Sequence, residues 1–166
     1  MFEALTEEFL FKTSMPWQAI LARLTGALVF CGLIGFEREV EQRPAGLRTH
    51  MLIGLAAAVY TLMMYELIAQ MEDAGDHIRM DPIRLLEAVT SGVAFLAAGL
   101  IVFAQGQVRG LTTGASMWLA ASVGVACGMG LWSIALMTTL LALIVVRLIK
   151  LGEKKAGTYD HEKGDF

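Results

Sequence analysis

The chain has 166 residues, of which 56% are hydrophobic, against the roughly 45–50% apolar usage of soluble domains. Its mean hydropathy is +0.60 and only 17% of its residues are charged, which argues against a disordered chain and against a soluble globule. The net charge of −3 argues against a nucleic-acid partner, which usually leaves a basic footprint.

Five apolar stretches are predicted to cross the membrane, and they lie at residues 17–36, 50–69, 82–104, 112–127 and 131–149. Residues 1–16 begin with acidic side chains and lack a cleavage site, so they are not expected to be removed as a signal peptide. Their apolar residues recur at helical spacing, so the segment is expected to lie along the interface. Residues 17–150 form the predicted transmembrane domain, and residues 151–166 form a polar tail.

The last two predicted spans share one long stretch without charge. From Gly110 to Val146 there are 37 consecutive residues without Asp, Glu, Lys or Arg. As one helix this stretch would be ~55 Å long, well beyond a hydrocarbon core of ~30 Å. The chain is therefore expected to fold back at Gly128-Met129-Gly130, because glycine tolerates a turn.

The flanking charges predict the orientation of the spans. In a five-span chain, nine Lys and Arg residues stand at the span ends, loops and tail of one side, with Arg147 in the last turn of the fifth span, and the other side holds only Lys12 and Arg79. Positive residues favour the cytoplasmic side. We therefore expect the N-terminus outside and the C-terminus in the cytoplasm.

An internal repeat relates the two halves of the chain. A shift of 64 positions aligns residues 21–59 with residues 85–123 at ten identities, among them Gly46-Leu47 with Gly110-Leu111. The shift pairs the first two spans with the next two in the same membrane sense. The expected fold is an all-α membrane protein with two tandem helical hairpins in parallel repeat plus a fifth helix.

Four charged residues in or beside the spans need an explanation, because ionisable groups are costly inside a membrane. They are Arg23, Asp81, Arg84 and Glu87, and the repeat aligns Arg23 with Glu87. Their spacing predicts one network at the outer side. Three interpretations remain open, namely a structural lattice of ion pairs, a cation or proton site around Asp81 and Glu87, and arginines that extend to the interface.

A second group of motif residues lies at the predicted cytoplasmic ends of the spans. Its members are Glu37, Arg38, Gly46, Arg48, Thr49, Arg109, Gly110 and Thr113. The repeated Gly-Leu-x-Thr step places Thr49 and Thr113 where a hydroxyl can cap a helix N-terminus. The arginines are interpreted as positive-inside anchors or as ligands for anionic lipid headgroups, for Glu37 or for the carboxylates of a partner. His50 alone is weak support for a metal site.

Small residues crowd the third and fourth spans, where they favour either close helix packing or a path for a solute. We expect a homo-oligomer on this basis, most simply a dimer. The chain shows no nucleophile–base pair, Gly-rich phosphate loop or zinc-binding helix motif, so enzymatic activity is not expected. No cofactor is expected either, with bound magnesium as the alternative.

Three stretches carry a recognisable motif pattern, and they run from Gly35 to His50, from Asp81 to Gly92 and from Val108 to Trp118. In order and spacing they resemble the MgtC/SapB family of bacterial inner-membrane proteins. The resemblance implies about five transmembrane helices and a link to growth in low magnesium and survival inside hosts. It also implies an action on other membrane proteins, so the leading hypothesis is a non-enzymatic modulator. The alternative is a small magnesium or proton transporter or channel.

The chain departs from the family pattern at three positions and lacks one region. Ala94 and Ala97 stand where the family usually has glycines, and their methyl groups are expected to loosen or shift a close helix crossing. Glu87 stands where the family commonly has a neutral polar residue. The soluble C-terminal domain of longer members is expected to be absent.

Overall fold

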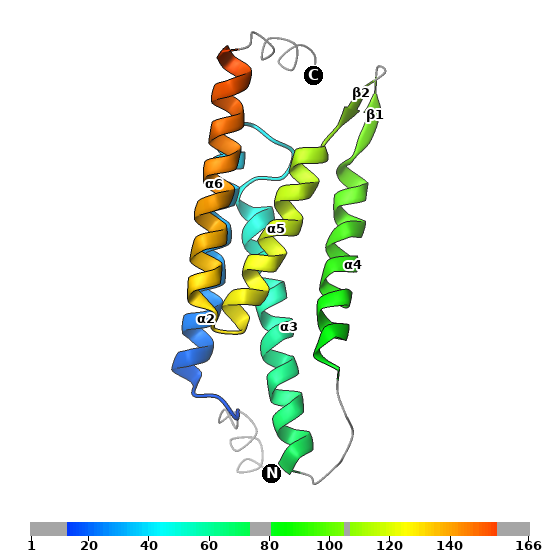
Figure 1. Cartoon of the computed structure of the whole chain (residues 1–166). Coiled ribbons are helices and arrows are strands. Elements are labelled where there is room, and N and C mark those ends of the chain that lie inside the picture. Colours follow the sequence, from blue (N-terminus) through cyan, green and yellow to red (C-terminus); the bar gives the residue numbers. More distant parts are fainter. Residues whose placement is uncertain (1–12, 74–80, 105–106, 156–166) are drawn as a thin grey trace, which may run out of the picture.

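The computed structural model describes residues 13–73, 81–104 and 107–155. Within these residues lie five helices, packed side by side, and one short antiparallel hairpin of strands (Figure 1). The helices are α2 (Trp17–Val40), α3 (Leu47–Asp73), α4 (Pro82–Leu100), α5 (Leu111–Gly128) and α6 (Trp132–Lys155), and the strands are β1 (Val102–Ala104) and β2 (Gln107–Arg109). The predicted all-α fold is confirmed.

Four of these helices are long and apolar enough to cross a membrane. They are α2, the Leu47–Met71 part of α3, the Ile83–Leu100 part of α4, and α5. The apolar part of α6, Trp132–Arg147, is shorter and packs beside α2 and α5 (Figure 1). The chain is therefore a multi-pass membrane protein.

The third span ends earlier than the sequence predicts. A helix was expected over 82–104, but α4 ends at Leu100, and Ile101 is extended with φ −84° and ψ 110°. β1 then pairs with β2, with Val102 opposite Arg109. The run of β-branched and aromatic residues that follows Leu100 favours a strand, and pairing with β2 satisfies its backbone.

The turn between the last two helices lies where it was predicted. α5 ends at Gly128, and Gly130 adopts the left-handed region with φ 75° before α6 begins. The N–H of Leu131 donates to the carbonyl of Ala126 (2.8 Å), which satisfies one of the last carbonyls of α5. The charge-free stretch is therefore a helical hairpin.

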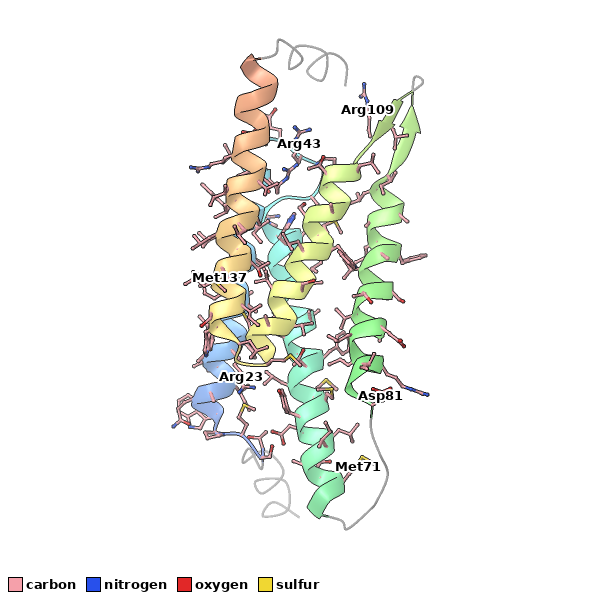
Figure 2. The ribbon with its side chains drawn as sticks, viewed as in Figure 1. Arg23, Arg43, Met71, Asp81, Arg109 and Met137 are labelled. Atoms are coloured by element: carbon pink, nitrogen blue, oxygen red, sulfur yellow. The ribbon has the colours of Figure 1, made fainter. Side chains whose placement is uncertain are left out.

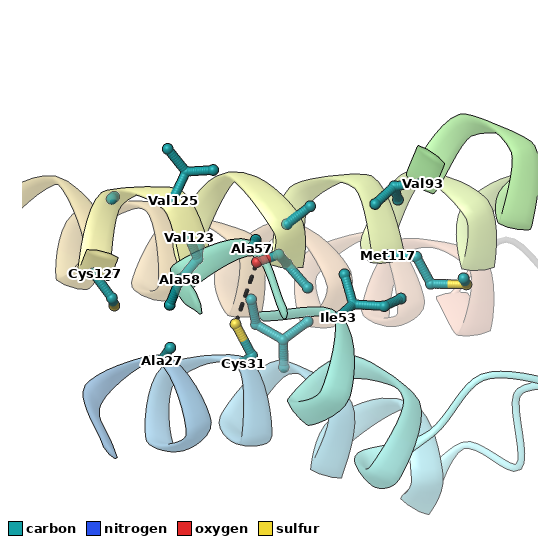
Figure 3. Close-up of a cluster of buried hydrophobic side chains, with 14 of the residues drawn as sticks. Ala27, Cys31, Ile53, Ala57, Ala58, Val93, Met117, Val123, Val125 and Cys127 are labelled. Carbon is teal, nitrogen blue, oxygen red and sulfur yellow. Dashed lines mark hydrogen bonds between the residues drawn. The ribbon is translucent and has the colours of Figure 1, made fainter. Parts of the chain in front are cut away.

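The core centres on α5, which is the most buried helix and packs against the other four. Small side chains from three helices meet there, including Ala27 of α2, Ala57 of α3 and Cys127 of α5 (Figure 3). A methyl group at Gly124 would collide with the backbone of Gly54, so the two helices cross at the distance set by these glycines. Without water to drive association, such close packing holds membrane helices together.

The internal repeat is visible in the architecture, although the two hairpins pack differently. Leu47 and Leu111, which the 64-residue shift aligns, begin α3 and α5. In the first hairpin a methyl group at Gly35 would lie 2.8 Å from Cβ of His50. The equivalent Gly99 has open space around it, and Ala97 packs against Gly114 instead.

Candidate functional site

Polar side chains occupy the two ends of the bundle. We call the end that holds the α2–α3 loop and the strand hairpin the arginine-rich end, after Arg38, Arg43, Arg48 and Arg109 (Figure 2). We call the end that holds the α5–α6 turn and the first turns of α2 and α4 the opposite end. The motif residues of the sequence divide between these two ends.

At the arginine-rich end, Arg38 is buried at the last turn of α2. Its side chain is 3% exposed, and Nη1 lies 3.8 Å from Oε2 of Glu37. The guanidinium therefore neutralises an adjacent carboxylate inside the protein and does not extend to the surface. Arg48 is exposed on α3, and Arg109 is half-buried on β2. The arginines of this end thus occupy different environments.

The α3 N-terminus is capped by a carboxylate. The N–H of Leu47 donates to Oε2 of Glu39 (2.9 Å), and a methyl group at Gly46 would occupy the position of that oxygen. A negative side chain at a helix N-terminus is favoured by the helix dipole. Gly46 therefore leaves room for a cap from the preceding helix.

The hydroxyl caps expected at the N-termini of α3 and α5 are not observed. The N-cap residue of α5 is Gly110, which has φ 89° and makes no side-chain cap, and among the described residues no hydrogen bond from the Thr113 hydroxyl to the helix start is seen. At α3 the observed acceptor is Glu39, the penultimate residue of α2, and not Thr49. A methyl group at Gly110 would collide with the carbonyl of Leu100, so this glycine lets β2 return against the end of α4.

A buried hydrogen-bond chain links α3 to α5 behind these motifs. His50 is fully buried, with Nδ1 at 2.8 Å from the carbonyl oxygen of Gly46 and Nε2 at 3.0 Å from Oγ of Ser116. Because a carbonyl only accepts, Nδ1 carries a hydrogen. The Ser116 hydroxyl also lies 2.8 Å from the carbonyl of Thr113. With one hydrogen, it donates either to Thr113 or to a neutral His50.

Sequence reasoning missed this link. It considered His50 only as an isolated metal ligand, and it did not single out Ser116. One signal was present, since a histidine within an apolar span needs a polar partner on a neighbouring helix. No spacing within one sequence identifies that partner. Within the described ranges, no three His, Cys, Asp or Glu side chains are grouped to hold a metal ion.

At the opposite end, Arg23 contacts α5 and α3. Its Nη1 donates to the carbonyl of Gly128 (2.8 Å), and its guanidinium lies 5.7 Å from the ring centroid of Tyr65. The last carbonyls of a helix lack partners and carry the negative end of the helix dipole. Arg23 is therefore satisfied by backbone and an aromatic ring.

The structure does not bring the four predicted network residues together. Asp81 caps α4 by accepting from the N–H of Ile83 (3.0 Å), while Arg84 and Glu87 are exposed on the same helix. Among the described residues no ion pair joins any of them to Arg23. The reason is that α4 packs chiefly on α5, on the side of the bundle away from α2 (Figure 2).

Glu66 of α3 is a second polar residue that sequence reasoning passed over. Its carboxylate accepts from the N–H and the hydroxyl of Ser14 (2.9 and 3.0 Å) and from the N–H of Met15 (3.3 Å). These contacts fix the chain just before α2. An acidic residue inside a predicted span was the available signal.

The comparison with protein families identifies the chain. The model of the MgtC family matches residues 24–155. The chain belongs to the MgtC family. Protein MgtC of Brucella abortus (strain 2308) is 40% identical over 140 residues, which cover 82% of this chain and 55% of that protein. "Putative magnesium transporter YhiD" of Escherichia coli (strain K12) is 34% identical over 128 residues, which cover 77% of this chain and 59% of that protein.

The chain spans 52–59% of the length of the curated relatives it matches. No solved structure matches it. Two of the three stretches that carry the MgtC resemblance, 35–50 and 108–118, lie at the arginine-rich end, where they form the α2–α3 loop, β2 and the first turns of α3 and α5. The third stretch, 81–92, forms the first half of α4. The MgtC motifs thus mark the two helix starts joined by His50 and Ser116, together with the loosely packed α4.

Proposed function

We propose that this chain is a non-enzymatic protein of the bacterial inner membrane that modulates partner membrane proteins in magnesium homeostasis, stress and virulence physiology. Membership of the MgtC family supports the proposal. The Escherichia coli relative, whose name refers to magnesium transport, supports the connection to magnesium. Its activity would be exerted through contacts in the membrane plane.

One face of α4 carries the proposal. Ser91, Ala94 and Ala98 form a stripe of small exposed side chains on the side of α4 turned away from the core residues Val93 and Ala97. Small side chains allow a second helix to approach closely, and exposed hydroxyls provide interhelical hydrogen bonds. We call these three residues the α4 stripe.

Two neighbours of the α4 stripe favour a protein partner. Phe95 is 79% exposed beside it, the largest exposure among the large apolar side chains described. Glu87 is exposed one turn before Ser91, within the membrane-spanning part of α4. A carboxylate that faces lipid is costly, whereas a partner helix with a polar or cationic side chain would satisfy it.

The same stripe supports the proposed homo-oligomer only in part. The small residues of α5, among them Ala120, Ala121 and Gly124, are buried within one chain and cannot serve a second copy. Their role is close packing inside the monomer. The small residues of α4 and α5 were both expected to form the contact between two copies of the chain. Only those of α4 face outward, so a dimer would form through α4.

Growth under magnesium limitation tests the proposal in a bacterium lacking its own MgtC-family gene. The wild-type chain should restore growth, and Ala94→Leu should not, because the larger side chain keeps a partner helix away from the α4 stripe. Ala22→Leu on α2 is the matched control, since Ala22 is also an exposed alanine but lies outside this stripe. Membrane levels of each variant are measured in parallel. Equal growth of the two variants at equal levels would contradict the proposal.

Transport is the second candidate function. The buried pair of His50 and Ser116 places a titratable ring and a hydroxyl between two membrane-spanning helices, as one step of a proton path requires. Purified protein in liposomes loaded with a magnesium-sensitive or pH-sensitive dye separates the two functions. A modulator alone leaves the dye signal unchanged, whereas flux through the purified wild-type chain that Ser116→Ala abolishes would favour transport.

The proposed orientation is that the arginine-rich end faces the cytoplasm. Single cysteines test it, because the native Cys31 and Cys127 are buried. Arg48→Cys should react with a membrane-impermeant maleimide only after cell lysis, and Arg84→Cys should react in intact cells with a permeable outer membrane. The reverse pattern would overturn the orientation.

A further inference from the structure

An open groove runs along the side of α4 that faces α3 and the start of α2. At the opposite end it widens into a cavity of about 1050 Å³ between α2, α3 and α4, lined by apolar residues such as Leu24, Met63 and Leu67. A narrower cavity of about 420 Å³ continues between α3 and α4, and the two share Tyr60 and Leu85. We call the two cavities together the α3–α4 groove.

Small side chains on both walls explain why the narrow part of the groove exists. Ala56 and Ala57 of α3 face Ala88 and Gly92 of α4, while α4 itself is held against α5. A methyl group at Gly92 would meet nothing within 4 Å. Within the hydrocarbon region such a space fills with apolar chains, since no water is present there and an empty groove forfeits dispersion contacts.

Charged side chains lie only at the wide end of the groove. Its polar lining includes Glu66 in the last third of α3, and Asp81 and Arg84 at the start of α4. Asp81 uses Oδ1 to cap α4. The exposed guanidinium of Arg84 makes no hydrogen bond or ion pair with the described residues. The groove thus combines an apolar slot with a mouth of mixed charge.

We propose that the α3–α4 groove binds a zwitterionic phospholipid whose headgroup ends in a primary ammonium, the phosphatidylethanolamine class. The acyl chains occupy the apolar slot. The phosphate accepts from Arg84, and the ammonium donates to Asp81 and Glu66, in charge-assisted hydrogen bonds. An anionic headgroup without an ammonium is repelled by both carboxylates, and a choline headgroup has no N–H to donate.

Native mass spectrometry of the detergent-purified chain tests this assignment. The protein is titrated with phosphatidylethanolamine, phosphatidylcholine and phosphatidylglycerol that carry identical acyl chains. We expect phosphatidylethanolamine to bind about tenfold more tightly than the other two, the difference that roughly one charge-assisted hydrogen bond provides. Equal affinities, or preference for phosphatidylglycerol, would overturn the proposal.

Two pairs of variants locate the binding. Gly92→Leu fills the slot and should remove the preference, whereas Gly99→Leu should retain it, because Gly99 also has open space but lies outside the groove. Arg84→Gln should weaken phosphatidylethanolamine binding about tenfold, and Arg147→Gln, an exposed arginine on α6, should not. Equal effects within either pair would overturn the assignment.

A protein occupant would give a different result. If a second copy or another membrane protein fills the groove, Gly92→Leu removes that protein from the complex while the three lipids bind equally. That outcome rejects the lipid and leaves the proposed modulator role intact. If Gly92→Leu removes the phosphatidylethanolamine preference without any effect on growth in low magnesium, the lipid site stands and the modulator role does not depend on it.

Discussion

The guanidinium of Arg23 on α2 donates a hydrogen bond to the carbonyl oxygen of Gly128, the last residue of α5, at 2.8 Å. Gly130 follows in the left-handed region, and a methyl group there would lie 3.0 Å from Nη2 of Arg23. The arginine thus closes the C-terminus of the central helix and packs against the turn to α6. Its position in an apolar span is explained by this structural role.

Loss of this contact should destabilise the α5–α6 turn. Arg23→Met removes a charge-assisted hydrogen bond to a backbone carbonyl and the contact with Tyr65. We expect the free energy of unfolding to fall by about 1.5–3 kcal/mol, measured by denaturation in mixed micelles. Arg84→Met is the control, since Arg84 is exposed and should change stability by less than about 0.5 kcal/mol. Equal losses would refute the assigned role.

The glycine crossing of α3 and α5 should tolerate no added methyl group. At Gly124→Ala the new Cβ would lie 2.8 Å from Cα of Gly54, so the two helices must separate. Overpacking of this kind costs about 1–3 kcal/mol. Gly99→Ala on α4, which meets nothing within 4 Å, should leave the melting temperature unchanged or raise it. A melting temperature for Gly124→Ala equal to that of the wild type would show that the crossing adjusts freely.

Gly46 and Glu39 should be energetically coupled. Glu39→Ala removes the cap of α3 and should cost about 1 kcal/mol of unfolding free energy. Gly46→Ala displaces the same carboxylate and should cost a similar amount. In the double variant the second change should add little, because the cap is already lost. Fully additive losses in this cycle would argue that Gly46 serves another purpose.

The hydrogen bond between His50 and Ser116 should contribute to the packing of α3 against α5. Ser116→Ala leaves Nε2 of a fully buried ring without its partner and should cost about 1–3 kcal/mol. Ser122→Ala is the matched control on the same helix, because the hydroxyl of Ser122 is exposed and contacts only the local carbonyl of Trp118. Thermal unfolding of both variants in detergent measures the difference, and no difference would mean that the ring finds another partner.

Glu66 should hold the residues that precede α2. Glu66→Leu removes the acceptors for Ser14 and Met15, so their amide hydrogens should exchange faster with solvent. Hydrogen exchange measured by mass spectrometry on the peptide that covers residues 13–20 reports this change. The rest of the chain should exchange as before, because the Glu66 carboxylate is exposed and makes no other hydrogen bond in the described residues. Unchanged exchange at residues 14 and 15 would contradict the tether.

The sequence by itself determined the class of protein, the number of apolar helices and the place where the last two helices turn. Apolar runs of span length and a glycine pair in the middle of a charge-free stretch are local signals. The fold follows them because a membrane favours apolar side chains and requires that backbone polar groups be satisfied within a helix. The parallel repeat could be read from the sequence because ten identities recur at a fixed shift of 64 positions. The end of α4 was misplaced because an apolar run is compatible with either helix or strand.

Only the tertiary structure decided which polar groups meet. Arg23, Asp81, Arg84 and Glu87 share a predicted depth in the membrane, yet α4 turns away from α2, and Arg23 binds a backbone carbonyl instead. His50 and Ser116 lie 66 positions apart and meet because α5 crosses α3 at Gly54 and Gly124. The depth of a residue in the membrane follows from its position along a span. Contact between two residues depends on how the helices rotate and cross, and this is determined by packing between side chains that are far apart in the sequence.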